Sequence, residues 1–374
     1  MKILLLDEGL PLTLHTAIGL KDAGWSVSIL TTQPGDARFI RRYAKLIEGP
    51  CITSSEYLEV IERLVSAEGF TCVLPSTNGT LYRLWDSDAR WQTLIYPRTE
   101  KWQRALLPNK RKLSEFVAGC GVPVPRFRRI ESLEEVPAAV KDLGLPLVVK
   151  GVSGAGGGSR IRLARTQEEV ADFLRDLYVK GEEWPTLQQF IHGPAFNVYG
   201  LFHEGKALRI YAAEQLELSS HVTGAALSFR SCGDPGLIKQ GLTVFQSLQW
   251  NGLACADFVR NEHGQFLYLD FDAAGMFVPD KTAGVEIIRP LEKLLRGEVP
   301  AAELGFRQGV RSVFFPQHLL ASLKEGGGRG LASLAMNLRG WQSLPWRTPG
   351  LAIHMIRQIY RQWLYLSSEG RKLS

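Results

Sequence analysis

The sequence predicts a mixed α/β fold, α+β overall, in which a small parallel layer precedes a central region of antiparallel hairpins and a helical C-terminal extension. Two observations carry this prediction. A strand–helix–strand pattern occupies the first 30 residues, which is typical of a parallel layer. Two later pairs of strands are joined by connections too short for a parallel crossover, which needs about a dozen residues or more.

Residues 1 to about 100 form the predicted parallel layer. Lys2–Leu6 is an apolar strand, residues 25–30 form the next strand after a helix, and residues 71–75 form a further one. The first turn has Gly9 but no GxGxxG pattern, so a dinucleotide-binding site is not expected. Ser76–Asn78 follow the end of a strand, where ligands commonly bind in such sheets. They are candidates either for substrate contact or for capping a helix.

A glycine-rich segment joins two strands in the middle of the chain. Residues 145–150 are apolar up to Lys150, residues 151–159 contain five glycines, and residues 160–163 form the second strand. Two strands this close must be antiparallel, so the glycines lie at a hairpin tip. The Gly-Lys-Ser/Thr of a Walker A loop is absent. The glycines either let the backbone approach a phosphate or simply form a flexible turn.

A second hairpin carries three aspartates. Residues 253–260 and 265–272 are predicted strands, and residues 261–264 between them are typical turn residues. A four-residue loop would place Arg260 opposite Gln265.

This register sets the faces of the acidic side chains. It places Asp257 opposite Tyr268, and since side chains alternate along a strand, Asp257, Asp270 and Asp272 then project from one face with Cys255 beside Asp270. Converging carboxylates repel one another unless a cation lies among them, and hard oxygen ligands suit Mg²⁺. The alternative is a slipped register that leaves the aspartates as solvated edge acids.

The end of the chain predicts an amphipathic helix over residues 351–366. Ile353, Ile356 and Trp363 recur at helical spacing, and arginines lie on another side. The apolar face either packs on the body of the protein or docks, with the basic segment 339–372, on an anionic membrane or an acidic partner protein.

Composition and charge exclude several classes of protein. The chain has 374 residues, 45% hydrophobic and 22% charged, which is ordinary for roughly two or three folded domains. The sequence has no run of about 18 apolar residues, so no membrane-spanning helix is expected. Acidic residues follow the short apolar start, so no signal peptide is expected. Five scattered cysteines without a CxxC pair fit a reducing cytoplasm.

The net charge of +6 is concentrated near the C-terminus. Residues 301–374 contain ten Lys/Arg and three Asp/Glu, a net charge of +7. Residues 1–300 therefore contain 34 Lys/Arg and 35 Asp/Glu, a net charge of −1. A nucleic-acid partner for the whole protein is therefore not expected.

The motifs together resemble the ATP-grasp superfamily, as in D-alanine–D-alanine ligase and the ATP-grasp units of carbamoyl-phosphate synthetase. Four similar motifs recur in order over residues 106 to about 290. They are Asn109-Lys110 with residues 121–125, residues 146–150 with the glycine hairpin, residues 188–198, and Asp257 with Asp270-x-Asp272.

The resemblance implies a domain organisation. A pre-grasp parallel α/β domain would occupy residues 1–105. A two-subdomain ATP-grasp fold would occupy residues 106–300, with a lid subdomain over about 125–187 that carries the glycine hairpin 151–159. A basic, aromatic and mostly helical C-terminal extension would occupy residues 301–374.

The resemblance also implies site residues. Lys110 and Lys150 match the two phosphate-contacting lysines of the family. The alternative is that they are solvated surface lysines. The hinge strand would hold adenine, although Phe190 could equally belong to the core. The implied cofactor-binding residues are Lys110, Lys150, Gly154, Gly156, Gly157, Gly158, Gln188, Gln189, Phe190 and Ile191. Asp257, Asp270 and Asp272 would hold one or two Mg²⁺ (or Mn²⁺) beside ATP.

Several residues depart from the family pattern. Asp270 and Asp272 stand where the family usually has Glu and then Asn, and Ala195 and Gln188 stand where many members have Glu. D-alanine ligases have an arginine at the position of Cys255, so the cation that stabilises the oxyanion must come from elsewhere.

Arg230 is the candidate catalytic residue on this ground. It follows residues 221–224, which are similar to a His-Thr-Gly stretch of the carbamoyl-phosphate synthetase units. A surface arginine is the alternative.

The resemblance implies an ATP-dependent carboxylate–amine (or similar nucleophile) ligase, ADP-forming, that acts through an acyl phosphate. The alternative is a degenerate nucleotide-binding protein with a scaffold or regulatory role. The implied partners are a small carboxylate and an amine, with a homodimer also allowed. The implied location is the cytoplasm, either free or peripheral at the inner face of the membrane.

Overall fold

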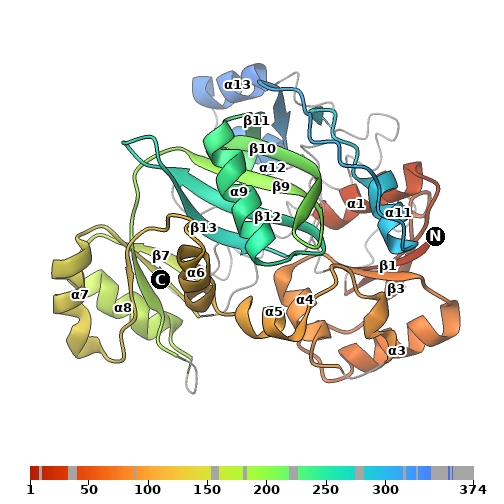
Figure 1. Ribbon diagram of the computed structural model, residues 1–374, viewed down its shortest axis with the longest axis horizontal. Helices are drawn as coiled ribbons and strands as arrows, with labels where there is room; N and C mark the ends of the chain where they lie inside the picture. Colours follow the sequence, from red (N-terminus) through yellow and green to blue (C-terminus); the bar gives the residue numbers. More distant parts are fainter. Residues whose placement is uncertain are drawn as a thin grey trace.

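The computed structural model describes residues 1–7, 11–32, 40–87, 90–152, 160–179, 183–218, 226–273, 282–314, 317–325, 327–337, 353 and 356. Their strands form three sheets, with helices packed against each (Figure 1). The structure therefore confirms the mixed α/β class. Among the described residues, none of the helices has the length and apolar character needed to cross a bilayer.

The first sheet is the predicted parallel layer. Its order is β3 (Lys45–Glu48), β2 (Ser26–Thr31), β1 (Lys2–Leu6), β4 (Cys72–Pro75), and all its pairs are parallel. Both faces of β1 are apolar, so both are covered. Leu14 of α1 (Pro11–Asp22) packs on the face of Ile3, while Ile61 of α3 (Tyr57–Glu68) packs on the face of Leu4, together with α4 (Asn78–Leu84).

The central sheet has six antiparallel strands. Its order is β13 (Phe266–Asp272), β12 (Gly252–Arg260), β9 (Ala195–His203), β10 (Lys206–Leu218), β11 (Ala226–Ser231), β14 (Arg311–Val313). Helix α9 (Pro235–Ser247) covers one face, and the other face shares a core with the first layer and α11 (Ile288–Leu295).

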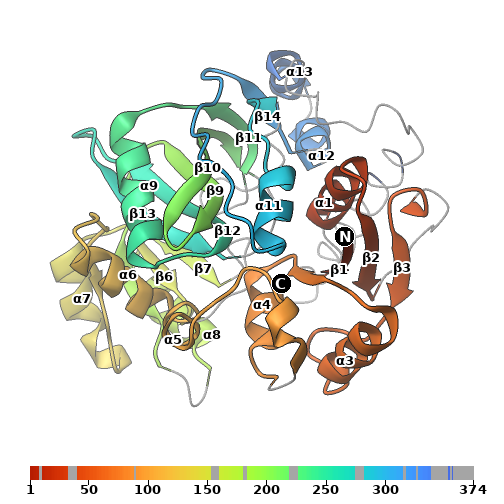
Figure 2. The same ribbon diagram turned by 45° about the vertical axis from the view of Figure 1, so that its right-hand side comes forward.

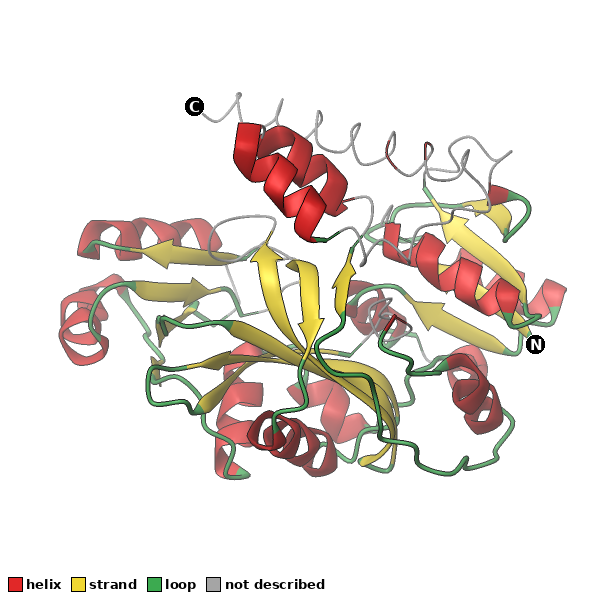
Figure 3. Ribbon diagram, turned by 90° about the horizontal axis from the view of Figure 1, so that it is seen from above, coloured by secondary structure: helices red, strands yellow, loops and turns green. Residues whose placement is uncertain are grey.

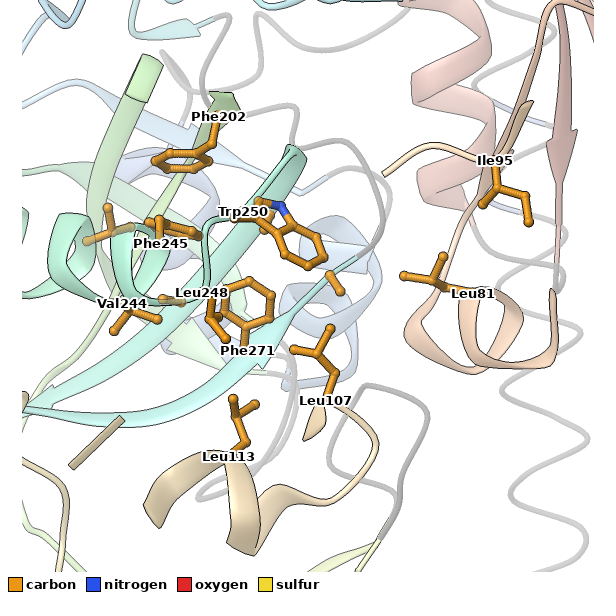
Figure 4. Close-up of a cluster of buried hydrophobic side chains, with 14 of the residues drawn as sticks. Leu81, Ile95, Leu107, Leu113, Phe202, Val244, Phe245, Leu248, Trp250 and Phe271 are labelled. Carbon is orange, nitrogen blue, oxygen red and sulfur yellow. The ribbon is translucent and has the colours of Figure 1, made fainter. Parts of the chain in front are cut away.

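A large aromatic cluster fills the core under α9. Phe202 stacks on Phe245 at 3.8 Å between ring centroids, and Trp250 meets Phe271 edge to face at 5.1 Å. Figure 4 shows Leu107 pointing toward this cluster from outside the central sheet. The same core continues into the first layer, so the central sheet and the parallel layer are packed as neighbours.

The third sheet has a hydrophobic core of its own. Its order is β5 (Phe127–Arg128), β8 (Thr186–Gln189), β6 (Leu147–Lys150), β7 (Ile161–Ala164). Helices α7 (Val136–Leu143) and α8 (Gln167–Leu177) bury their apolar sides against it. The predicted antiparallel hairpin is confirmed, because Lys150 pairs with Ile161. The glycines of its tip, Gly154, Gly156, Gly157 and Gly158, lie outside the described residues.

The remaining described helices are short. They are η1 (Arg90–Leu94), α5 (Lys101–Leu106), α6 (Lys110–Gly119), η2 (Leu133–Glu135), α12 (Gln317–Glu325) and α13 (Gly327–Met336). Helix α6 begins where the Asn109 side chain accepts a hydrogen bond from Lys112 N, so a side-chain cap fixes its first residue. The predicted helix 351–366 lies outside the described residues except for Ile353 and Ile356.

Gly241 tests the packing of α9 on the central sheet. A Cβ at this position would lie 2.7 Å from the Cβ of Val198, a branched side chain with little freedom to move. We expect Gly241→Ala to lower the free energy of unfolding by about 1–3 kcal/mol, although alanine has the higher helix propensity. Gly119→Ala is the matched control, because a Cβ at this helical glycine meets nothing within 4 Å. Equal losses for both variants in urea denaturation would contradict the packing.

Candidate active site

The β12–β13 hairpin carries the three aspartates, and its register differs from the predicted one. The turn closes one residue later, with Asn261 N donating to Gln265 O at 3.0 Å, so Arg260 pairs with Phe266 rather than Gln265. A shift of one residue exchanges the two faces of a strand. This one-residue shift alone would place Asp270 on the opposite face of the sheet from Asp257.

A β-bulge reverses this exchange. Phe258 pairs with Tyr268 but Asp257 pairs with Asp270, so Leu269 is an extra residue in β13. Asp257, Asp270 and Asp272 therefore do share one face, as predicted, although the pairing of Asp257 with Tyr268 was wrong. The predicted neighbour of Cys255 was also wrong, because Cys255 lies opposite Asp272.

Two lysines from separate elements reach the bulged strand. Lys110, the first residue of α6, forms an ion pair with Asp270. Lys150, the last residue of β6, donates to the carbonyl of the bulge residue Leu269 at 2.9 Å. The backbone of Lys110 also donates to Val152 O at 3.2 Å. These bonds bring together the Asn109-Lys110 motif at the start of α6, the glycine hairpin and the aspartate hairpin.

Burial and charge act in opposite directions on this group. Burial alone would lower the pKa of the Lys110 ammonium, but the charges of Asp270, Asp272 and Asp257 outweigh it and the pKa is raised. Burial would raise the pKa of Asp270, but Lys110 and Lys150 lower it, so this carboxyl is ionised. Burial lowers the pKa of Lys150 to about 8, against the attraction of Asp270.

Within the described ranges, neither of the other two carboxyls forms an ion pair with a lysine. Burial, with repulsion from Asp272 and Asp270, raises the pKa of Asp257 well above its usual range. Burial, with repulsion from Asp270, raises the pKa of Asp272 to about 6. These two carboxyls therefore hold a proton more tightly than exposed aspartates do. Within the described part of the chain, no group of three or more His, Cys, Asp or Glu is arranged to hold a metal ion by itself, so a cation here needs additional oxygen ligands.

Asn78 contacts the site from the first layer, which the sequence did not reveal. Its Nδ2 donates to Asp272 Oδ1 at 3.1 Å and to Phe271 O at 3.2 Å, and its Oδ1 accepts from Ala273 N at 2.7 Å. The capping role belongs to its neighbour Thr77, whose side chain accepts from Thr80 N. The position of Asn78 after a strand end was the available signal, but the contact with Asp272 depends on how the two sheets pack.

Gln215 of β10 is a second residue that sequence reasoning missed. Its Nε2 donates to Asp257 Oδ1 at 3.3 Å. Asn197 of β9 pairs with Asp257 on the neighbouring strand, and its buried side-chain Oδ1 has no hydrogen-bond partner among the residues that the structure describes. Amide groups therefore line the carboxylate face beside Asp257.

The predicted hinge residues lie on and just after β8. Gln188 is buried and pairs with Val148, while Gln189, Phe190 and Ile191 are half-buried. The N–H groups of Gln189 and Phe190 already donate to Arg126 O at 2.8 Å and Pro146 O at 3.4 Å. A backbone donor for a ligand must therefore come from beyond Phe190.

Arg230 does not reach the aspartates. It pairs with Glu214 in the sheet and forms an ion pair with the Glu214 side chain, with nearly half of its own side chain exposed. Its neighbour Phe229 is buried in the same core as Cys255, so Phe229 and the aspartates share a face and Arg230 points to the opposite one. The predicted catalytic role of Arg230 is inconsistent with this placement. Residues 221–224, which suggested it, lie outside the described residues.

Comparisons with known proteins agree with the resemblance. No family model matches the chain. A D-alanine–D-alanine ligase of Marinobacter nauticus is 31% identical over 103 residues, which cover 28% of this chain and 31% of that protein. Several further curated matches are also ligases or synthases. The chain spans about a fifth to a third of the length of the first curated relatives that it matches.

Solved structures match much more of the chain. A biotin carboxylase of Campylobacter jejuni, in complex with an ATP analogue, has a TM-score of 0.68 at 15% identity and covers 83% of this chain and 74% of that one. The ADP complex of an N5-carboxyaminoimidazole ribonucleotide synthetase has a TM-score of 0.66 at 15% identity, and the match covers 87% of this chain and 84% of that one. The chain thus has the fold of the ATP-grasp superfamily.

Asp272 gives a prediction about pH in the metal-free protein. Because the folded protein raises the pKa of this carboxyl from 3.8 to about 6, it binds a proton more tightly than the unfolded chain does. The contribution of Asp272 to stability is therefore present below about pH 4 and is lost as the pH rises through 6. We expect metal-free Asp272→Asn to melt about 2–6 °C above the wild type at pH 7.5, and this gain to shrink toward pH 4.

Asp172→Asn, at an exposed site on α8, is the matched control and should show no such pH dependence. A gain for Asp272→Asn that is absent at pH 7.5, or that grows toward pH 4, would contradict the raised pKa.

Proposed function

We propose that this chain is an ADP-forming carboxylate–amine ligase that uses ATP and Mg²⁺ and acts through an acyl phosphate. The observation that carries the proposal is the convergence of Lys110, Lys150 and three aspartates on one bulged hairpin. The curated relatives support it, since they include a D-alanine–D-alanine ligase and a phosphoribosylamine–glycine ligase, and similar structures hold ADP or an ATP analogue.

The donor set fits a magnesium ion. Three carboxylates share a face, and burial together with mutual repulsion raises the pKa of two of them. Asp257, Asp270 and Asp272 would hold the ion together with phosphate oxygens, as Mg²⁺ prefers. When bound, the ion would neutralise the β- and γ-phosphates during transfer.

Lys110 would change partners when nucleotide binds. In the nucleotide-free protein its ammonium balances Asp270. A cation on Asp270 would release Lys110 to contact phosphate, so the lysine keeps a buried carboxylate paired until the substrate arrives. Lys150 is anchored to Leu269 O and would keep its place while it contacts the phosphates.

The other implied roles stay predictions. The hinge residues Gln188–Ile191 would hold adenine, and Gly154–Gly158 would cover the phosphates. The domain boundaries at about 105 and 300 are likewise untested. We omit Arg230 from the catalytic residues. We further infer a cytoplasmic enzyme for small-molecule acids and amines, and a homodimer stays a prediction.

A second candidate function is nucleotide binding without ligation. It is favoured by the Asp270-x-Asp272 pair, which replaces the Glu and Asn usual in the family and leaves one carboxyl with a raised pKa. A regulatory or scaffold protein would bind ATP analogues but release no ADP with any acid and amine.

Turnover separates the two candidates. We expect ADP release with a panel of carboxylic acids to depend on both an acid and an amine. Lys110→Met should slow this release about 100-fold, since it removes a charge that faces the transferred phosphate. Lys112→Met is the matched control on the same helix, because Lys112 is exposed, and its rate should stay within about twofold. Nucleotide binding without ADP release across the panel would contradict the ligase.

A further inference from the structure

Helices α12 and α13 form a hairpin whose polar side is buried and whose apolar side is exposed. The buried residues are His318, Ser322, Ser333 and Asn337, each 1–6% exposed. In contrast, Leu323 is 60% exposed, Leu331 69% and Met336 58%. A surface helix normally buries its apolar stripe, so the pattern here is reversed.

A partly buried carboxylate holds the hairpin in this orientation. Glu217 at the end of β10 accepts hydrogen bonds from His318 Nε2 at 3.0 Å, Ser333 Oγ at 2.6 Å and Asn337 Nδ2 at 3.1 Å. The Ser228 hydroxyl donates to it as well. The hydrogen bond from His318, aided by the serines, lowers the pKa of Glu217 to about 2. Turning the hairpin over would remove three of these four hydrogen-bond donors from a partly buried carboxylate.

The hairpin lies far across the sheet from the candidate active site. It packs beside β11 and β14, whereas the aspartates lie on β12 and β13 at the other edge of the same sheet. Figure 2 shows α12 and α13 at the periphery of the molecule next to β14. A partner on the outer face of the hairpin would therefore leave the carboxylates accessible.

The sequence after the hairpin indicates the chemistry of that partner. Residues 338–374 contain six Lys/Arg and one Asp/Glu, a net charge of +5. Trp341, Trp346 and Trp363 are interspersed among these charges. Basic residues together with apolar side chains favour binding to anionic lipid, and tryptophan, like tyrosine, is enriched where bilayer and water meet.

We propose that the outer face of α12–α13, defined by Leu323, Leu331 and Met336, docks on a bilayer that contains anionic lipid. The apolar side chains enter the headgroup boundary, and the basic residues that follow them pair with lipid phosphates. This inference is independent of the proposed ligase activity, because it rests on a different edge of the central sheet.

Vesicle sedimentation of the full chain tests the proposal. The wild type should sediment with vesicles of phosphatidylcholine that contain about 30% phosphatidylglycerol, at least about tenfold more tightly than with phosphatidylcholine alone. Leu323→Ser, Leu331→Ser and Met336→Ser combined should weaken binding by about tenfold or more. Salt raised from about 50 to about 500 mM should weaken it as well.

Val299→Ser with Leu304→Ser is the matched control, since these loop residues are also exposed apolar side chains, and it should bind as the wild type does. Leu331→Ser alone serves if the triple variant does not fold. Three outcomes would overturn the proposal: no sedimentation with anionic vesicles, equal losses in the control, or a concentration-dependent dimer or polyglutamate binding in place of lipid binding.

Discussion

The ion pair between Lys110 and Asp270 is the interaction on which the candidate active site depends. It joins the first turn of α6 to the bulged strand β13, and Lys110 lowers the pKa of Asp270. Asp270 stays ionised because Lys110 and Lys150 face it, whereas Asp257 and Asp272 have raised pKa values. A cation bound there together with phosphate would favour the ionised forms of Asp257 and Asp272.

Each sheet contributes one fixed point to this arrangement. The third sheet supplies Lys150, whose bond to Leu269 O uses a carbonyl that the bulge leaves out of the β-ladder. The first layer supplies Asn78, which holds the Asp272 carboxylate and the backbone beyond it. Viewed from above, strands extend across the molecule from one side to the other, with helices along them (Figure 3). The position of the aspartates is therefore a property of the whole assembly and not of the hairpin alone.

Local pattern was sufficient to predict the elements, and long-range packing explains what it missed. The parallel layer, the glycine hairpin and the shared face of the aspartates all follow from alternation and connection length. The register did not follow, because the longer turn and the bulge at Leu269 each shift it by one residue in the same direction. The total shift of two residues restores the predicted face but not the predicted pairs. The contacts of Asn78, the face of Arg230 and the polar underside of α12–α13 depend on partners distant in sequence, so no local pattern could reveal them.

The most direct measurement is a crystal structure with a non-hydrolysable ATP analogue and Mn²⁺, located by its anomalous signal. The Mn²⁺ peak should lie among Asp257, Asp270 and Asp272, with Lys110 moved from Asp270 to a phosphate oxygen. An analogue bound elsewhere, or a hairpin without Mn²⁺ in which Lys110 still pairs with Asp270, would contradict the proposed site.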